Sequence, residues 1–178
     1  MRATGLGPLV VVCALAALQP PAARAADPAE GTYGTFWLDD GDTGDRWELV
    51  LRDSVAYRTV EEDFDMALVS IVLASQPVNR ERMRAKLGGG EGWWHTHGPH
   101  LRVDLCERDG EWAACGFHVQ LGGKSISGSG GDDGASVESV TVSEDRVQLR
   151  LVTPEPLTFF RDRYGLEAAV DLPIESFE

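Results

Sequence analysis

The sequence is short of positive charge and of long apolar stretches. Lys and Arg number 16 against 29 Asp and Glu, which gives a formal net charge of −13. Because such a chain repels nucleic-acid phosphates and anionic lipid, we expect no nucleic-acid partner. The apolar stretch at residues 9–18 covers about half of a bilayer core, and no later stretch is long enough to span one. We therefore expect no membrane span.

Motifs of several enzyme classes are also absent. No serine lies in a Gly-x-Ser-x-Gly elbow, no Cys–His pair stands in a recognisable catalytic context, and no phosphate-binding glycine loop opens a helix. The sequence therefore favours a protein that is not an enzyme.

The N-terminal residues read as an export signal. Arg2 supplies a positive start, residues 9–18 form the apolar core, and Ala23-Arg24-Ala25 offers the small residues that signal peptidase recognises. We expect a signal peptide at residues 1–25, cleaved after Ala25, and a short disordered lead-in at residues 26–30. The predicted location is the periplasm or the medium, with a single β domain at residues 31–178.

The remaining sequence has the composition and periodicity of a β-rich domain. Hydrophobic residues make up 43% of the chain and charged residues 25%, which is enough for a folded core. From Gly31 onward apolar residues recur at every second position between Gly and Asp clusters, the period of half-buried strands. The stretch 66–74 is nearly all apolar, which favours a central strand, with a buried helix as the alternative. The predicted strands are 31–38, 46–60 with a bend, 66–74, 99–106, 111–121, 136–143, 146–153 and 164–172.

One short helix is expected between the strands. Asn79 is a good N-cap after Pro77, and three glycines at 88–90 end the helical segment. Met83 and Leu87 form its only apolar stripe, so the helix should lie on the surface. About eight strands with one inserted helix indicate an all-β fold, either an antiparallel β-sandwich or a small β-barrel.

Two cysteines follow the leader and flank one predicted hairpin. In an oxidising compartment Cys106 and Cys115 suggest a disulfide. A type II′ turn at Gly110-Glu111 would place the two cysteines opposite each other, within bridging distance, but would mix apolar and polar side chains on each face. A three-residue loop at 108–110 keeps the apolar face uniform and separates the thiols unless a bulge intervenes. The sequence therefore does not decide whether Cys106 and Cys115 form a disulfide.

Histidines are clustered as well. Three of the four lie within GWWHTHGPH at residues 92–100, and the three-residue loop would place the fourth opposite His100. Imidazole binds zinc and copper, so a metal-binding protein is one functional hypothesis. An ordinary loop with solvated or hydrogen-bonded histidines is the alternative. The candidate ligands are His95, His97, His100 and His118.

The segment HTHGPH resembles the HxHxDH signature of the metallo-β-lactamase fold family. Pro99, however, stands where that family has its metal-binding Asp, and only His118 follows downstream. We infer no homology from six residues.

Two turns offer further candidates. Asp40, Asp42 and Asp45 crowd one turn and could hold calcium, although a polar hairpin turn accounts for them better. SISGSG at residues 125–130 resembles the Ser-Gly loop of periplasmic lysozyme inhibitors. Since an acidic protein suits a basic lysozyme surface, inhibition of a lysozyme is a minor alternative function.

The order of features resembles that of a group of uncharacterised exported bacterial β-rich proteins. The resemblance lies in GTYGTF at the start, SVAYRT, an apolar strand ending in SQPV, and the closing YGLEAAVDLPI. It implies a small periplasmic β domain and supplies no catalytic residues.

The main functional hypothesis is binding of a protein partner or a small ligand by a non-enzymatic domain. Trp93 and Trp94 lie together in a Gly-rich loop, and tryptophan provides a large contact area with few rotatable bonds. Packing in the core is the alternative role for this pair.

Overall fold

The computed structural model describes residues 32–61, 66–87, 98–129 and 136–177. Eleven strands and one helix lie in this part of the chain. No helix within it is long and apolar enough to cross a membrane. The elements are β1 (Thr32–Asp39), β2 (Arg46–Leu51), β3 (Asp53–Glu61), β4 (Met66–Ala74), α1 (Arg80–Leu87), β5 (His100–Arg108), β6 (Glu111–Leu121), β7 (Lys124–Ser129), β8 (Ser136–Val142), β9 (Arg146–Val152), β10 (Leu157–Phe159) and β11 (Asp162–Glu175).

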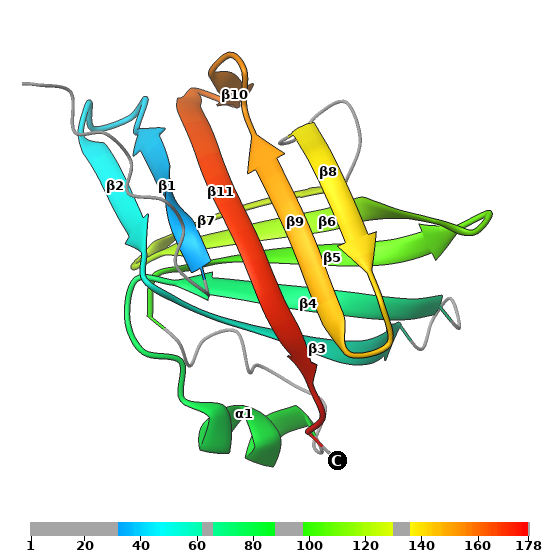
Figure 1. Ribbon diagram of the computed structural model, residues 1–178. Coiled ribbons are helices and arrows are strands. Elements are labelled where there is room, and N and C mark those ends of the chain that lie inside the picture. Colours follow the sequence, from blue (N-terminus) through cyan, green and yellow to red (C-terminus); the bar gives the residue numbers. More distant parts are fainter. Residues whose placement is uncertain (1–31, 62–65, 88–97, 130–135, 178) are drawn as a thin grey trace, which may run out of the picture.

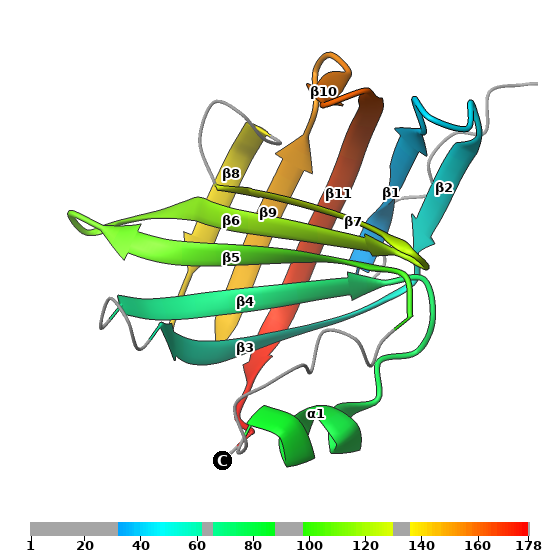
Figure 2. The ribbon, with the colours of Figure 1, turned by 180° about the vertical axis from the view of Figure 1, so that it is seen from behind.

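The strands form two layers. β3 to β7 follow one another as antiparallel neighbours, which we call the meander sheet. β2, β1, β11, β9 and β8 form the other layer, which we call the terminal sheet, and all its pairs are antiparallel. The layers join where the end of β11 pairs in parallel with β3, at Ile174 and Ala56. Figures 1 and 2 show that the strands of the two layers cross steeply.

The prediction of an all-β, largely antiparallel fold with one short helix is confirmed. The sheet is open, because β2 and β7 stand at the ends of its pairing path. Three differences raise the strand number above the expected eight. The 46–60 segment divides into two strands at Arg52, and β7 and β10 are additional. Residues 125–129 thus belong to a strand paired with β6 and not to a free loop.

The main core lies between the two layers. The alternation of β9 buries Val147, Leu149 and Leu151 and exposes the residues between them. β4 is buried on both faces, as its apolar sequence predicts. One of its faces contributes to the main core, and the other contributes Val72 and Ala74 to a second cluster beneath α1. Burial on both faces explains why β4 lacks the polar alternation of β9.

Helix α1 begins where the sequence predicts. Asn79 Oδ1 accepts a hydrogen bond from the backbone N–H of Arg82 at 2.9 Å, which is N-cap geometry. Met83 is fully buried against the second cluster, together with Val78. Arg80 Nε donates to Glu175 Oε1 at 2.7 Å, so the helix is tied to the end of β11.

Both predicted registers of the β5–β6 hairpin are wrong. Arg108 pairs with Glu111, so the turn consists of Asp109 and Gly110 alone, with φ values of 54° and 83°. Positive φ at both central residues defines a type I′ turn, and Asp tolerates that conformation better than most residues. A β-bulge at Cys115 then restores the uniform apolar face, because Leu105 pairs with Ala114 while Asp104 pairs with Gly116.

Candidate binding cleft

Four of the predicted site residues lie outside the described residues, namely Trp93, Trp94, His95 and His97. The other two histidines lie on the outer face of the meander sheet. His118 stands opposite Arg102 and not opposite His100, which pairs with Gln120. The ring centroids of His100 and His118 are nevertheless 6.2 Å apart. No group of three or more His, Cys, Asp or Glu suited to a metal ion occurs among the described residues.

Both histidines take part in hydrogen bonds to neighbours on the sheet. His100 Nδ1 lies 2.7 Å from the carbonyl oxygen of Gly98, and His118 Nδ1 lies 2.6 Å from Ser127 Oγ. Since a carbonyl oxygen only accepts, the Nδ1 of His100 donates. These bonds agree with the hydrogen-bonded alternative considered for the histidines and leave the metal site a prediction.

A polar row crosses the same outer face beside the histidines. Ser70 Oγ donates to Asp104 Oδ1 at 2.6 Å, and Arg102 forms an ion pair with the same carboxylate at 3.0 Å. Burial raises the pKa of the neighbouring Tyr57 well above its usual value. The row ties β3, β4 and β5 together.

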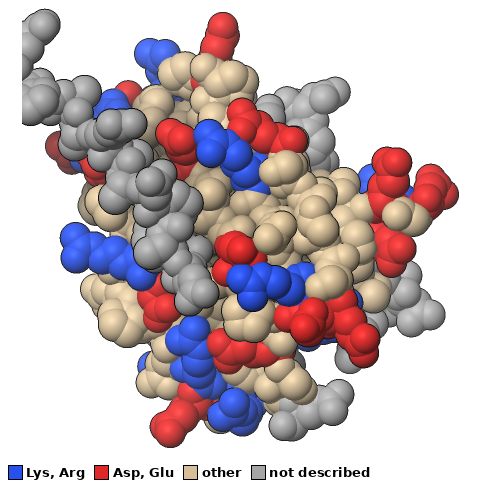
Figure 3. Space-filling model, in the orientation of Figure 1, with Lys and Arg blue, Asp and Glu red and all other residues tan. Residues whose placement is uncertain are grey.

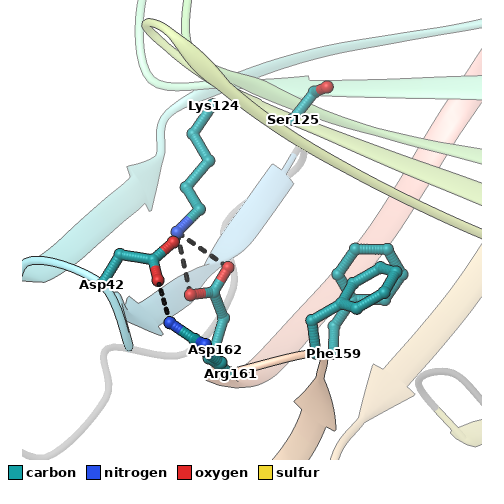
Figure 4. Close-up of a pocket in the computed structure, with 7 residues that line it drawn as sticks. Asp42, Lys124, Ser125, Phe159, Arg161 and Asp162 are labelled. Carbon is teal, nitrogen blue, oxygen red and sulfur yellow. Dashed lines mark hydrogen bonds and ion pairs between the residues drawn. The ribbon is translucent and has the colours of Figure 1, made fainter.

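A cleft of about 610 Å³ lies where three turns meet at one end of the layers (Figure 4). The turns are those joining β1 to β2, β6 to β7, and β10 to β11. Only the topology brings these segments together, because they lie far apart in the sequence. The residues that line the cleft are Asp42, Lys124, Ser125, Phe159, Phe160, Arg161 and Asp162.

Lys124 is the central cation of this cleft. Its Nζ lies 2.8 Å from Asp40 Oδ2 and 2.8 Å from the carboxylate of Asp162. The hydrogen bonds from Asp162 and Asp40 raise the pKa of Lys124 above its ordinary value. At neutral pH the side chain is thus a fixed ammonium ion, held between two carboxylates that are themselves largely buried.

The carboxylate of Asp40 accepts hydrogen bonds within the β1–β2 turn. The hydrogen bond from Lys124, followed by the backbone N–H groups of Asp42 and Thr43, lowers the pKa of Asp40. The polar-turn interpretation of this Asp-rich segment agrees with these bonds, because the carboxylate satisfies local N–H donors.

The β1–β2 and β10–β11 turns approach each other at Gly41. A Cβ atom at this position would lie 2.1 Å from the carbonyl oxygen of Arg161, so only glycine fits. The N–H of Gly41 also donates to Asp162 Oδ1 at 3.0 Å. The floor of the cleft is therefore built from backbone and ion pairs that fix the two turns relative to each other.

Phe160 is the most exposed large apolar side chain in the described part of the chain. Its exposed fraction is 89%, against 43% for Trp47 and 42% for Val50. Its φ is 55°, in a two-residue turn closed by the Phe159–Asp162 pair. A bulky residue with positive φ costs about 1–3 kcal/mol, and such strained residues cluster at functional sites. The ring stands edge-on to Phe159, with the two centroids 4.8 Å apart.

The charges that line the cleft are balanced. Arg161 Nη1 lies 3.2 Å from Asp42 Oδ1, and both side chains are largely exposed. An exposed pair of this kind contributes little to stability and is available for other hydrogen bonds. Figure 4 shows Arg161 directed toward Asp42 and Lys124 directed toward Asp162. The cleft thus offers both donors and acceptors beside an aromatic surface.

The surface around the terminal sheet carries both signs of charge. Figure 3 shows acidic and basic side chains interspersed over this face. Two ion pairs hold β9 to its neighbours, Arg146 with Asp171 and Arg150 with Glu138. Acidic and basic side chains therefore alternate over the described part of this face.

No family model, curated protein or solved structure matches this chain. The assignment of the cleft therefore rests on its own residues. The sequence signals for it are slight: FFRD at 159–162 and GGK at 122–124 read as ordinary turns, and no spacing rule connects them.

Proposed function

We propose that this chain is a non-enzymatic binding domain whose cleft takes a small uncharged polar ligand, a saccharide. The observation that carries the proposal is the strained, 89% exposed Phe160 at the edge of a cleft with balanced charges. An aromatic ring that is kept in water at a cost in backbone strain is explained when a ligand covers it.

The polar side of the cleft narrows the ligand class. Lys124 and Arg161 supply N–H donors, and Asp42 and Asp162 supply acceptors, each already paired within the cleft. An ionic ligand that bound Lys124 or Asp162 would have to break their largely buried ion pair and leave one charge without its partner. A sugar ring carries hydroxyl groups, which both donate and accept, around a C–H face that fits against an aromatic ring. The C–H face of a sugar would lie against Phe160, and its hydroxyl groups would hydrogen-bond to the two ion pairs.

The ionisation of Lys124 supports binding in preference to catalysis. A lysine acts as a nucleophile or a base only when its pKa is lowered, whereas the two carboxylates raise that of Lys124. Asp40 is held in its ionised form for the same reason. We place the domain outside the cytoplasm, in the periplasm or the medium, because of the export signal in its first 25 residues.

Isothermal titration calorimetry with neutral hexasaccharides tests this function. Maltohexaose, cellohexaose and chitohexaose differ in linkage and in the acetamido group, and we expect one of them to bind with a Kd of about 1 mM or below. Phe160→Ala should weaken that binding about tenfold or more. The matched control is Val50→Ala, at another exposed apolar position. Absence of heat with all three saccharides at millimolar concentration contradicts the proposal.

Metal binding is the second candidate, because His100 and His118 lie side by side on one face of the meander sheet. We propose zinc or copper as the ion, with His95 and His97 as the further ligands. Titration with each ion should give micromolar binding that His118→Ala abolishes. Unchanged binding in that variant excludes His118 as a ligand, and absence of binding to the unaltered protein removes this candidate.

A further inference from the structure

The β-bulge in β6 has a chemical consequence for the two cysteines. In an unbroken ladder the face of a side chain is set by strict alternation, and neighbouring residues point to opposite faces. Cys106 pairs with Ala113, and Cys115 is the extra residue that has no counterpart between Ala114 and Gly116. A bulge of this type re-aims the inserted side chain.

The inserted cysteine is consequently aimed at the strand that carries its partner. Cys115 Sγ lies 3.5 Å from the carbonyl oxygen of Asp104, which stands two residues from Cys106 on β5. Cys106 is fully buried, whereas Cys115 is only partly buried. Both are free thiols in this structure. The hairpin therefore holds one buried and one partly exposed thiol on neighbouring strands.

We propose that Cys106 and Cys115 are the site of an intramolecular disulfide, formed when the chain meets a disulfide oxidant. The bulge brings the inserted cysteine toward its partner across the ladder and also keeps the apolar face uniform, a combination that neither simple hairpin register provides. This inference is independent of the saccharide cleft.

The reaction is a pair of thiol–disulfide exchanges. The Cys115 thiolate attacks one sulfur of a low-molecular-weight disulfide such as oxidised glutathione, breaks its S–S bond and releases one glutathione thiol. Cys106 then attacks the mixed disulfide at Cys115 Sγ, which forms the Cys106–Cys115 bond and releases the second glutathione. The two protons lost by the cysteines end on the two glutathione thiols.

The environment of Cys115 sets the rate of this reaction. Burial, followed by the Cys106 thiol, raises the pKa of Cys115 to about 12. Only a small fraction is thiolate at neutral pH, so exchange in the folded protein should be slow. Oxidation should be faster while the chain folds, and the finished bond should then resist reduction.

Refolding under two redox conditions tests the proposal. The full chain carrying Cys13→Ser, which leaves only Cys106 and Cys115, is refolded with oxidised glutathione or with excess dithiothreitol. We expect no free thiol and a mass lower by about two hydrogens in the oxidised sample. The oxidised form should also melt about 5–10 °C higher, because the cross-link restricts the unfolded chain.

The control is the same chain with Cys115→Ser, a change at a partly exposed position that leaves Cys106 in place. It should keep one thiol, and its melting temperature should not depend on the redox condition. Two free thiols after oxidative refolding, or stable glutathione adducts on both cysteines, would overturn the proposed disulfide.

Discussion

Phe160 combines exposure, a positive φ and a position at the edge of the cleft. Each of these features works against stability or is neutral to it. A glycine in this turn would adopt the same φ without strain, so the side chain itself requires an explanation. Ligand contact is the explanation that we propose.

Phe160→Gly should separate stability from binding. Release of about 1–3 kcal/mol of backbone strain offsets the loss of the edge-on contact with Phe159, worth about 0.5–1.5 kcal/mol. We therefore predict a free energy of unfolding that is nearly unchanged or higher by up to about 2.5 kcal/mol, together with loss of saccharide binding. Denaturant titration measures the first effect. A destabilisation of more than about 1 kcal/mol would show that the ring has a structural role.

The ion pairs of Lys124 should make the stability of the fold depend on pH in both acidic and alkaline solution. Asp40, whose folded pKa is lowered, stabilises the fold above its unfolded value of 3.8 and loses that contribution as the pH falls through its folded pKa. Lys124, whose folded pKa is raised, stabilises the fold below 10.5 and loses that contribution as the pH rises through its folded pKa.

Melting curves of the unaltered protein and of Lys124→Met test both the acidic and the alkaline loss of stability. The difference in melting temperature should be constant between about pH 5 and 9 and should shrink in more acidic and more alkaline solution. The control is Arg150→Met, which removes a half-exposed cation elsewhere on the terminal sheet. A difference that does not change with pH would contradict the ionic role of Lys124.

At the scale of elements, the cleft depends on how closely two turns approach each other. Gly41→Ala would place a Cβ atom against the carbonyl oxygen of Arg161. Because that oxygen belongs to the backbone, one of the two turns would have to shift to relieve the clash. We predict a loss of about 2–4 kcal/mol in the free energy of unfolding. Gly123→Ala, in the third turn, is the matched control because no atom lies within 4 Å of the added Cβ. Equal effects of the two substitutions would refute the close approach.

Helix α1 depends on one apolar side chain. Met83 is fully buried in the second cluster, although the remainder of the helix is mostly polar. Met83→Ala should lower the free energy of unfolding by about 2–4 kcal/mol, whereas Arg82→Ala should change it by about 0.5 kcal/mol or less. Urea denaturation of both variants provides the comparison, and a similar small effect in both would mean that the helix is not docked.

The elements that could be predicted from the sequence are those that local patterns determine. The alternation in β9 and the apolar run in β4 indicate strands, and Asn79 marks the start of α1. The register of the β5–β6 hairpin could not be predicted in this way. A bulge inserts one residue without a sequence signal, and the two-residue turn at Asp109 and Gly110 differs from both turns that the sequence suggests.

The cleft could not be predicted from the sequence for a different reason. The pairing of β11 with β1 and β10 brings two of its three turns together, and Lys124 reaches them from the β6–β7 turn. No pattern within one segment encodes that meeting. The Asp-rich turn is visible in the sequence, but the carboxylate of Asp40 binds Lys124 and local N–H groups.

At the scale of the whole molecule, the turns of the cleft lie apart from the β5–β6 turn. The turns around Lys124 form the cleft, while the β5–β6 turn lies at the opposite end of the meander strands (Figures 1 and 2). The strands between them are paired continuously through β5, β6 and β7. Oxidation of the hairpin should therefore leave saccharide affinity unchanged, which calorimetry on the oxidised and reduced forms measures.

The most direct measurement for the account is chemical-shift mapping by nuclear magnetic resonance. The labelled chain is titrated with the hexasaccharide that gives the strongest heat. The account predicts that the largest backbone amide shifts fall in the three turns of the cleft, at residues 40–43, 122–125 and 159–162. Shifts centred on the outer face of the meander sheet, around His100 and His118, or no shifts at all, would contradict it.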